Sequence, residues 1–286
     1  MNDAYKVLLE TGMSSKSAME TLPFTATRNL LAAEAIWRRG DVEQPWTYIV
    51  SGLVCASLPG DDGAFNAVNA YGPGSWVGEA CLVNGQASAL EYVCVNPTVA
   101  LQVPLERARE LLATDIDFCR YIARLAAWRS EHRADQLALM GNGSPPLRVT
   151  FGLALLAEAL QSGSSPQPRT EAGDTLQLPL KQALLAGMFG VSRGMFSFYV
   201  QQLAAIGWVR VNYSLVQLLG LGKWKKFSEA LRQSRASMVK PTVDELVSFL
   251  LKGQTTTEPH ASERRSGYRH AEFPGQGGSG NSGPIG

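Results

Sequence analysis

One segment carries most of the structural information in this 286-residue chain: Leu180-Lys-Gln-Ala-Leu-Leu-Ala-Gly-Met-Phe-Gly-Val-Ser-Arg193. Apolar residues at positions 180, 184, 185 and 188 predict one face of a helix, and Gly190 predicts a turn after it. Ser192 is a typical N-cap for a second helix, in which Phe196, Val200 and Leu203 lie at i, i+4 and i+7 and are expected to be buried. The segment therefore predicts two helices joined by a short turn.

A β-hairpin is predicted directly after these helices. Two alternating runs, Trp208-Val-Arg-Val211 and Leu215-Val-Gln-Leu218, flank Asn212-Tyr-Ser214. Gly207 supplies the residue after the end of the second helix. The whole unit matches a winged helix-turn-helix, whose second helix enters the major groove of DNA while the first helix braces it.

The side chains expected to face DNA come from both helices. Arg193 would hydrogen-bond a guanine edge, and Phe198 would contact a thymine methyl group. Phosphate contacts are expected from Lys181, Gln182 and the basic run Lys223 to Lys226. The complete predicted DNA-binding set is Lys181, Gln182, Ser192, Arg193, Gly194, Ser197, Phe198 and Gln201.

The distribution of charge supports a polyanionic partner for this region. Residues 1 to 110 hold 7 Lys and Arg against 12 Asp and Glu, whereas residues 178 to 235 hold 8 against 1, although the formal net charge of the chain is only +1. A basic surface of this kind attracts nucleic acid. On charge alone, a solvated basic face without a partner explains the pattern equally well.

The sequence ahead of this unit changes from strand patterns to helix patterns. From Trp37 to Pro104, short apolar runs are separated by turn residues, as in Tyr48-Ile-Val-Ser-Gly52 and Pro59-Gly-Asp-Asp-Gly63. This spacing is typical of a small antiparallel barrel or roll, which Val99–Val103 would complete. Leu105–Leu112 then predicts a first helix.

A long helix is predicted from Asp115 to Met140, because this span contains no Pro or Gly and Gly141-Asn-Gly-Ser-Pro-Pro146 follows it. Its stripe with 4-3 spacing holds Phe118, Ile122, Leu125, Arg129, His132, Gln136 and Leu139. Such a stripe favours a coiled-coil dimer seam, apolar in its first half and polar in its second. The alternative is that the stripe packs against its own domain.

The chain offers no pattern for a metal site or an enzyme. Its four cysteines, Cys55, Cys81, Cys94 and Cys119, are scattered singly, and its three histidines are dispersed. No apolar run is long enough for a membrane span and no signal-peptide core begins the chain, so we expect a cytoplasmic protein that does not bind membranes. We expect no catalytic residues and no metal.

The last part of the chain is expected to be mostly without structure. Arg148–Leu160 predicts a short apolar helix, and Ser162–Gly173 predicts a polar loop. Beyond Arg235, the capping box Thr242-Val-Asp-Glu245 predicts a short helix ending at Gly253. Gly275–Gly286 is rich in glycine and is expected to be disordered.

The ordered set of these motifs resembles the cyclic-AMP receptor protein and fumarate–nitrate regulator superfamily over roughly residues 35 to 222. The matching motifs are Tyr48-Ile-Val-Ser-Gly-Leu-Val54, Gly72-Pro-Gly-Ser-Trp-Val-Gly-Glu79, the long helix and Gly190-Val-Ser-Arg193. The resemblance implies an α+β fold in four parts. These are a cyclic-nucleotide-binding-like β-roll sensor at 1–114, a dimerisation helix at 115–141, a winged helix-turn-helix at 147–235, and a short capped helix with a disordered tail at 236–286.

The resemblance also implies an effector pocket in the roll, formed in relatives by a short helix and loop that match Gly78 to Ala89. Glu79 is retained, but the phosphate-binding Arg-Ser pair of the family falls on Ala87-Ser88 or Ser88-Ala89, and the Thr-Ser pair on Arg133-Ala134. A phosphate without its cation loses a charge-assisted pair, so we expect cyclic AMP not to be the effector. The pocket is either vestigial or takes another small molecule or nucleotide. Its candidate residues are Gly78, Glu79, Ala80, Ser88, Ala89, Arg129, His132 and Arg133.

The second helix of the motif departs from the family as well. The usual Arg-Glu-x-x-x-Arg triad corresponds to Arg193, Gly194 and Phe198. We therefore expect a homodimer that binds a roughly palindromic operator in double-stranded DNA with a different or looser sequence preference, and RNA polymerase is a further candidate partner. The alternative is a ligand-sensing or protein-interaction module that no longer reads DNA sequence.

Overall fold

The computed structural model describes residues 3–59, 65–163, 174–212 and 215–233. All of them belong to one compact unit, Met1–Gln254, whereas a second unit, Thr255–Gly286, lies outside the described residues. The predicted capped helix at 242–253 and the predicted disordered tail also lie outside the described residues.

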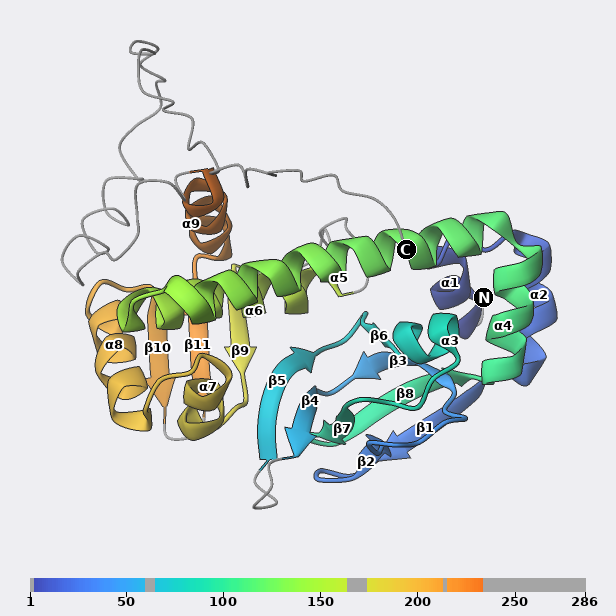
Figure 1. Cartoon of the computed structure of the whole chain (residues 1–286), viewed down its shortest axis with the longest axis horizontal. Helices are drawn as coiled ribbons and strands as arrows, with labels where there is room; N and C mark the ends of the chain where they lie inside the picture. Colours follow the sequence, from blue (N-terminus) through green and yellow to red (C-terminus); the bar gives the residue numbers. More distant parts are fainter. Residues whose placement is uncertain (1–2, 60–64, 164–173, 213–214, 234–286) are drawn as a thin grey trace, which may run out of the picture. The chain divides into compact units, whose positions relative to one another are not determined.

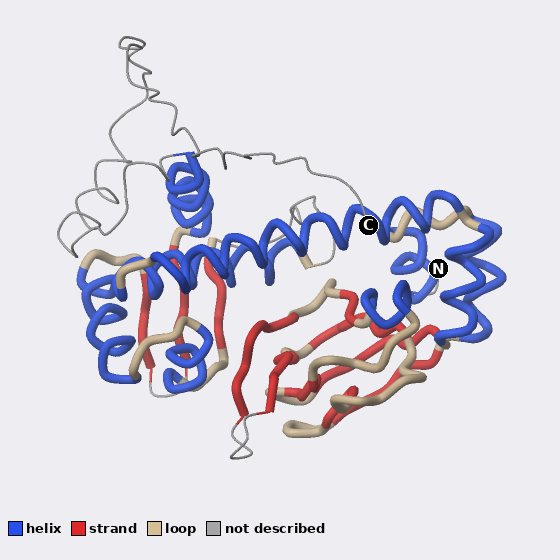
Figure 2. The backbone as a smooth tube through the Cα atoms, in the orientation of Figure 1, coloured by secondary structure: helices blue, strands red, loops and turns tan. Residues whose placement is uncertain are grey.

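Eight strands form the two antiparallel sheets of a roll, with strand orders β1-β8-β3-β6 and β2-β7-β4-β5. Figures 1 and 2 show the two sheets facing each other. The side chains between them form an apolar core that includes Trp37, Ile49, Tyr71, Tyr92 and Ala100. The strands are β1 Ala26–Leu30, β2 Ala35–Trp37, β3 Trp46–Ser51, β4 Val54–Pro59, β5 Phe65–Tyr71, β6 Trp76–Val77, β7 Glu91–Cys94 and β8 Thr98–Val103.

The roll begins earlier than the sequence patterns predicted. The strands were predicted from Trp37 onward, but β1 and the start of β2 precede that residue. Strand β1 pairs with β8 in antiparallel register, with Ala26 opposite Gln102 and Leu30 opposite Thr98. Its first four residues are exposed, so it lacks the alternation of apolar and polar residues that identifies a half-buried strand.

Short helices stand before and within the roll. Helix α3 Glu79–Asn84 begins the segment for which the resemblance implies a short helix and loop. The others, α1 Asp3–Glu10, α2 Ser15–Thr21 and the 3₁₀ turn η1 Leu22–Phe24, were not predicted. Leu8 and Ala18 are completely buried against the outer face of the roll, in the same apolar cluster as Trp46 and Trp76. The N-terminal helices therefore extend the core of the roll.

The two helices predicted after the roll are confirmed as α4 Leu105–Thr114 and α5 Ile116–Asn142. The carboxylate of Asp115 caps α5 by accepting hydrogen bonds from the backbone N–H groups of Asp117 and Phe118, both at 3.1 Å. This cap satisfies donors that the first turn of a helix leaves unpaired. The chain leaves α5 at Gly143, whose N–H bonds the Leu139 carbonyl at 2.7 Å.

The predicted dimer seam on α5 is wrong, because that stripe packs inside its own chain. Phe118, Ile122 and Leu125 are at most 3% exposed, and Arg129, His132 and Leu139 are each 6% exposed. Heptad spacing shows that a helix has one apolar side, but it does not show whether the chain itself or a second copy covers that side. Here the roll and the following helix cover it.

Beyond α5 the chain forms helices around a small sheet. Helix α6 starts at Pro145, earlier than the predicted Arg148, because prolines are accepted in the first turn of a helix. The sheet has the order β10-β11-β9. The helices and strands of this part of the chain are α6 Pro145–Ser162, β9 Thr175–Leu178, α7 Gln182–Met188, α8 Arg193–Ala205, β10 Val209–Asn212, β11 Leu215–Leu219 and α9 Leu221–Gln233.

The predicted hairpin is confirmed by the antiparallel pairing of β10 with β11, in which Val209 faces Leu218 and Asn212 faces Leu215. Residues 213 and 214 of its turn lie outside the described residues. Strand β9 and helix α9 were not predicted. Buried Trp224 of α9 packs edge-on against Trp208 with ring centroids 5.1 Å apart, and this contact fixes α9 on the sheet.

No single helix within the described ranges is long and apolar enough to cross a membrane. The pair α7 and α8 reaches the required length and composition only when taken together, and the two helices are bent by 101° at their junction.

Candidate nucleic-acid interface and sensor pocket

The junction between α7 and α8 is built by local backbone requirements. Gly190 adopts a positive φ of 62°, and a Cβ there would lie 2.5 Å from Cε of Met140. Glycine is therefore the residue that fits this turn. Ser192 caps α8 by accepting a hydrogen bond from the Met195 N–H at 3.2 Å, as the sequence predicted.

Arg148 of α6 holds this junction against the end of α5. Its guanidinium donates to three backbone carbonyls, those of Met140 at 2.7 Å, Gly143 at 2.9 Å and Gly190 at 3.1 Å. One side chain thus satisfies carbonyls at the end of α5 and in the turn before α8. No signal in the sequence distinguished Arg148 from other arginines.

The buried face of α8 consists of the three residues that the sequence predicted. Phe196 and Val200 are completely buried, and Leu203 is 3% exposed. They pack in the same cluster as Leu185 and Ala186 of α7, and α7 also contacts β5 of the roll. Helix α7 is therefore braced on one side by the roll and supports α8 on another.

The outer face of α8 remains accessible. Arg193, Gly194 and Gln201 are exposed, Ser197 is half-buried, and Phe198 is 56% exposed. Lys181 is exposed and Gln182 half-buried at the start of α7. The structure therefore places the predicted DNA-binding residues on two adjoining helices, with the α8 side chains of this set facing outward.

The three lysines of α9 form a separate basic surface. Lys223, Lys225 and Lys226 are exposed while Trp224 and Phe227 are buried, so α9 is amphipathic. Figure 1 shows α9 and α7 on opposite sides of α5. The structure does not bring these lysines together with Lys181.

Inside the roll, Glu79 of α3 forms an ion pair with Arg129 of α5. The side chains of Glu79 and Arg129 are 10% and 7% exposed. The same guanidinium donates to the Trp76 carbonyl, and it lies 5.2 Å above the centre of the Tyr71 ring. These contacts engage N–H groups and one face of the Arg129 guanidinium. A bound anion would have to compete for the same N–H groups.

The protonation states of this pair are set by each other. Burial alone would raise the pKa of Glu79, but the charge and hydrogen bonds of Arg129 hold it below its ordinary value. Burial would lower the pKa of Arg129, whereas the Glu79 carboxylate raises it. Both groups are therefore charged at neutral pH, and their charges cancel locally.

The rest of the predicted pocket is largely filled. A Cβ on Gly78 would lie 1.8 Å from the Trp37 ring, which packs edge-on against Tyr92 at 5.4 Å. Ser88 is buried and donates its hydroxyl to the Leu90 carbonyl at 2.7 Å. Ala80, Ala89 and Arg133 are exposed.

The remaining hollow beside Arg129 has a volume of about 10 Å³ and is lined by Tyr71, Trp128, His132 and Arg133, among others. Of the predicted effector residues, the structure thus brings together Glu79 and Arg129, with His132 and Arg133 at the edge. The hollow holds no more than about one water molecule.

A second charged cluster joins the helices beside His132. Arg232 of α9 bonds Asp135 of α5 at 2.8 Å and Glu158 of α6 at 2.6 Å, and Ser228 donates to Glu158. His132 is 6% exposed, stacks on Trp128 with ring centroids 5.5 Å apart, and has no hydrogen-bond partner for Nε2 among the described residues. Burial lowers its pKa, with Arg232 acting in the same direction and Glu158 and Asp135 against it.

Comparison with known proteins identifies the N-terminal part. Residues 27–115 match the model of the cyclic nucleotide-binding domain family. No curated protein matches the chain.

Solved structures with a similar fold come from several bacteria. FixK2 from Bradyrhizobium japonicum aligns with a TM-score of 0.57 at 17% identity, covering 70% of this chain and 96% of that one. A putative cyclic nucleotide binding protein from Ruegeria pomeroyi gives 0.53 at 17% identity, covering 78% and 93%. A CRP/FNR-family transcriptional regulator from Thermus thermophilus gives 0.51 at 22% identity, covering 71% and 98%. The chain therefore carries a cyclic nucleotide-binding-like domain over residues 27–115, and its fold is similar to that of these three solved structures.

Proposed function

We propose that this protein is a transcription regulator that binds double-stranded DNA as a homodimer, with α7, α8 and the β10–β11 hairpin acting as a winged helix-turn-helix. The observation that carries the proposal is the accessible outer face of α8, supported from behind by its buried Phe196 and Val200. A recognition helix needs this combination of a rigid inner face and a free outer face. The division into 1–114, 115–141, 147–235 and 236–286 belongs to this proposal.

In this proposal Arg193 contacts a guanine edge, Phe198 contacts a thymine methyl group, and Gln201 and Ser197 make further base or phosphate contacts. Lys181 and Gln182 contact the phosphate backbone. Arg193 is the only cationic side chain on α8, and its neighbour is Gly194. Sequence discrimination therefore depends more on DNA shape than it does for a recognition helix with several charged side chains that contact bases.

The homodimer would use the exposed side of α5 rather than the buried stripe. The residues at 4-3 spacing on that side are Ile116, Arg120, Ala123, Ala127, Ser130, Ala134, Leu137 and Gly141, and all of them are exposed. Ile116 and Leu137 are 62% and 73% exposed. Small residues between them would let two α5 helices approach closely, and a two-fold pair would place the α8 helices about 34 to 36 Å apart on a roughly palindromic site.

The effector pocket of the roll is proposed to be vestigial or altered. Arg129 neutralises Glu79 from within the chain, and the remaining hollow of about 10 Å³ has no room for a nucleotide. We therefore propose that cyclic AMP is not the effector. A regulator of this kind has no catalytic role, acts in the cytoplasm and would meet RNA polymerase as a further partner.

Genome-wide DNA capture with the tagged protein, followed by a salt-titrated gel shift on captured and random duplexes, tests the function. We expect a steep salt dependence together with discrimination between the two duplexes. Failure to bind any duplex at low salt would overturn the proposal.

One observation favours a second candidate, a protein-interaction module without sequence-specific DNA reading. Phe198 and Met195 are 56% and 37% exposed on α8, which is unusually apolar for a DNA-facing surface. In that case the gel shift shows no discrimination, and Phe198→Ser leaves DNA affinity unchanged.

A further inference from the structure

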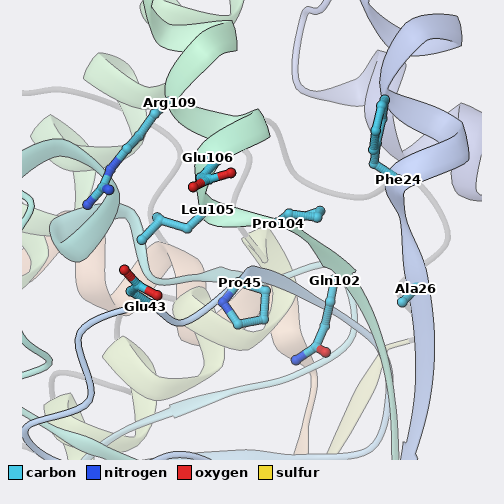
Figure 3. Close-up of a pocket in the computed structure, with 9 residues that line it drawn as sticks. All are labelled: Phe24, Ala26, Glu43, Pro45, Gln102, Pro104, Leu105, Glu106 and Arg109. Atoms are coloured by element: carbon cyan, nitrogen blue, oxygen red, sulfur yellow. The ribbon is translucent and has the colours of Figure 1, made fainter.

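A cavity of about 390 Å³ opens at the roll, and its lining includes neither Glu79 nor Arg129. Figure 3 shows it between the 3₁₀ turn η1, strands β1 and β8, the loop before β3 and the first turn of α4. Pockets that bind small molecules usually have volumes of about 300 to 1,000 Å³. This space is thus large enough for a small ligand, unlike the hollow of about 10 Å³ beside Arg129.

The cavity exists because small or rigid residues line its walls. Ala26 of β1 lies directly opposite Gln102 of β8 in the sheet, so no bulky side chain fills the space beside the amide of Gln102. Pro45 and Pro104 border the cavity from two loops. Leu105 and Phe24 add apolar surface, and Phe24 is 58% exposed.

A buried amide lies at this cavity with unused hydrogen-bonding capacity. Gln102 is 8% exposed, and its Nε2 donates only a long bond of 3.4 Å to Thr47 Oγ1. Its amide oxygen accepts no hydrogen bond from any described residue. A buried polar group without a full set of partners costs free energy, so such groups commonly serve a ligand or water.

Three charged side chains at the cavity are also without partners in the described ranges: Glu43, Glu106 and Arg109 form no ion pair or hydrogen bond there. Arg107 of the same helix differs, because it pairs with Glu110 at 2.9 Å and Glu20 at 3.6 Å. Helix α4 therefore uses Arg107 for structure and leaves Glu106 and Arg109 at the cavity.

We propose that this cavity binds a small organic amine with an apolar, ring-sized body. Two carboxylates against one guanidinium leave the rim with a net negative charge, which favours a cationic ligand. The ammonium group would lie between Glu43 and Glu106, the Gln102 oxygen would accept a hydrogen bond, and the body would pack on Phe24 and Leu105. The site shares no residue with the Glu79–Arg129 pair, so the inference goes beyond the proposed function and does not depend on DNA binding.

The test uses 2-phenylethylamine as the cationic probe and 3-phenylpropionate as its anionic counterpart, each titrated into the full chain and followed by heteronuclear NMR. We expect saturable binding of the amine in the millimolar range or tighter, at least about tenfold stronger than that of the carboxylate. Equal binding of both probes, or no saturable binding of the amine, would overturn the proposal.

Variants locate the site. Glu43→Gln combined with Glu106→Gln is expected to weaken amine binding by at least about tenfold. Glu10→Gln combined with Glu131→Gln removes the same two charges from exposed positions outside the cavity lining and should leave amine binding unchanged. Ala26→Phe fills the cavity and is expected to abolish binding at an unchanged melting temperature, since Ala26 is exposed. Binding that survives Ala26→Phe in a folded chain would place the ligand elsewhere and contradict the proposal.

Discussion

The guanidinium of Arg129 is ion-paired with the carboxylate of Glu79 inside the roll, although 50 positions separate these residues in the chain. Glu79 belongs to the short helix α3, and Arg129 lies in the middle of α5. The pair joins the roll to the long helix that leads to the proposed DNA-binding unit. Its geometry leads to the first two predictions.

Breaking this pair from one side should destabilise the protein strongly. Arg129→Met leaves the Glu79 carboxylate buried without its cation, and the free energy of unfolding should fall by about 3 to 5 kcal/mol. Urea denaturation measures the change. Arg28→Met removes the exposed pair of Arg28 with Glu34, whose side chains are 52% and 37% exposed, and should cost at most about 1 kcal/mol. Equal losses in the two variants would contradict a structural role for the buried pair.

Cyclic AMP should not bind the wild-type chain with micromolar affinity. The cation nearest the pocket is already engaged by Glu79, and Ala87, Ser88 and Ala89 supply no replacement charge. Calorimetry with a cyclic-AMP-binding regulator as positive control provides the measurement. Binding with micromolar affinity by this chain would refute both the vestigial pocket and the expectation from the missing arginine.

Acidification should destabilise the protein through His132. Its pKa is lowered in the folded state by burial, so the unfolded chain binds the proton more readily and stability falls as the pH drops below the unfolded value of 6.5. Glu79 has a lowered pKa from an ordinary value of 4.5, so its effect belongs to more acidic conditions.

The measurement is urea unfolding at about pH 7.5 and about pH 5.5 for the wild type and for His132→Gln. The wild type should lose more stability between these values than the variant. Parallel losses would show that His132 is not the group responsible.

Arg193→Ala should weaken operator binding by about 1 to 3 kcal/mol and relax the preference at one base pair. Arg39→Ala removes the same charge from an exposed turn of the roll and should leave operator affinity unchanged. Gel shifts with the captured operator measure both. An Arg193→Ala variant with full affinity and full discrimination would remove α8 as the reading helix.

Arg148→Met should loosen the turn before α8 without unfolding the roll. The variant loses three hydrogen bonds, to the carbonyls of Met140, Gly143 and Gly190, and leaves those carbonyls to water or unpaired. Amide hydrogen exchange should accelerate in α7 and α8 while the strands β3 and β8 stay protected. Unchanged exchange in α7 and α8 would show that the turn holds without Arg148.

Local sequence signals were sufficient to predict a helix whose position is determined by its own capping residues and apolar spacing. Ser192 as a cap, Gly190 as a turn residue and the spacing of Phe196, Val200 and Leu203 correctly predicted α8 and its buried face. The predicted long helix Asp115–Met140, ended by the Gly141–Pro146 stretch, agrees with α5 to within two residues at each end. Exposed β1, in contrast, lacks an apolar period. Helix α9 is held by contacts with other elements, such as Trp224 on Trp208 and Arg232 with Asp135 and Glu158, which no local pattern shows.

From residue order alone, the chain specified a roll, a long helix and two braced helices before a hairpin, because caps, turns and apolar periods act over a few neighbouring residues. Which side of α5 is covered, and which cation meets Glu79, depended on how elements far apart in the chain pack together. A buried charge is stabilised by whatever partner the fold brings within reach, and no local pattern names Arg129 as that partner.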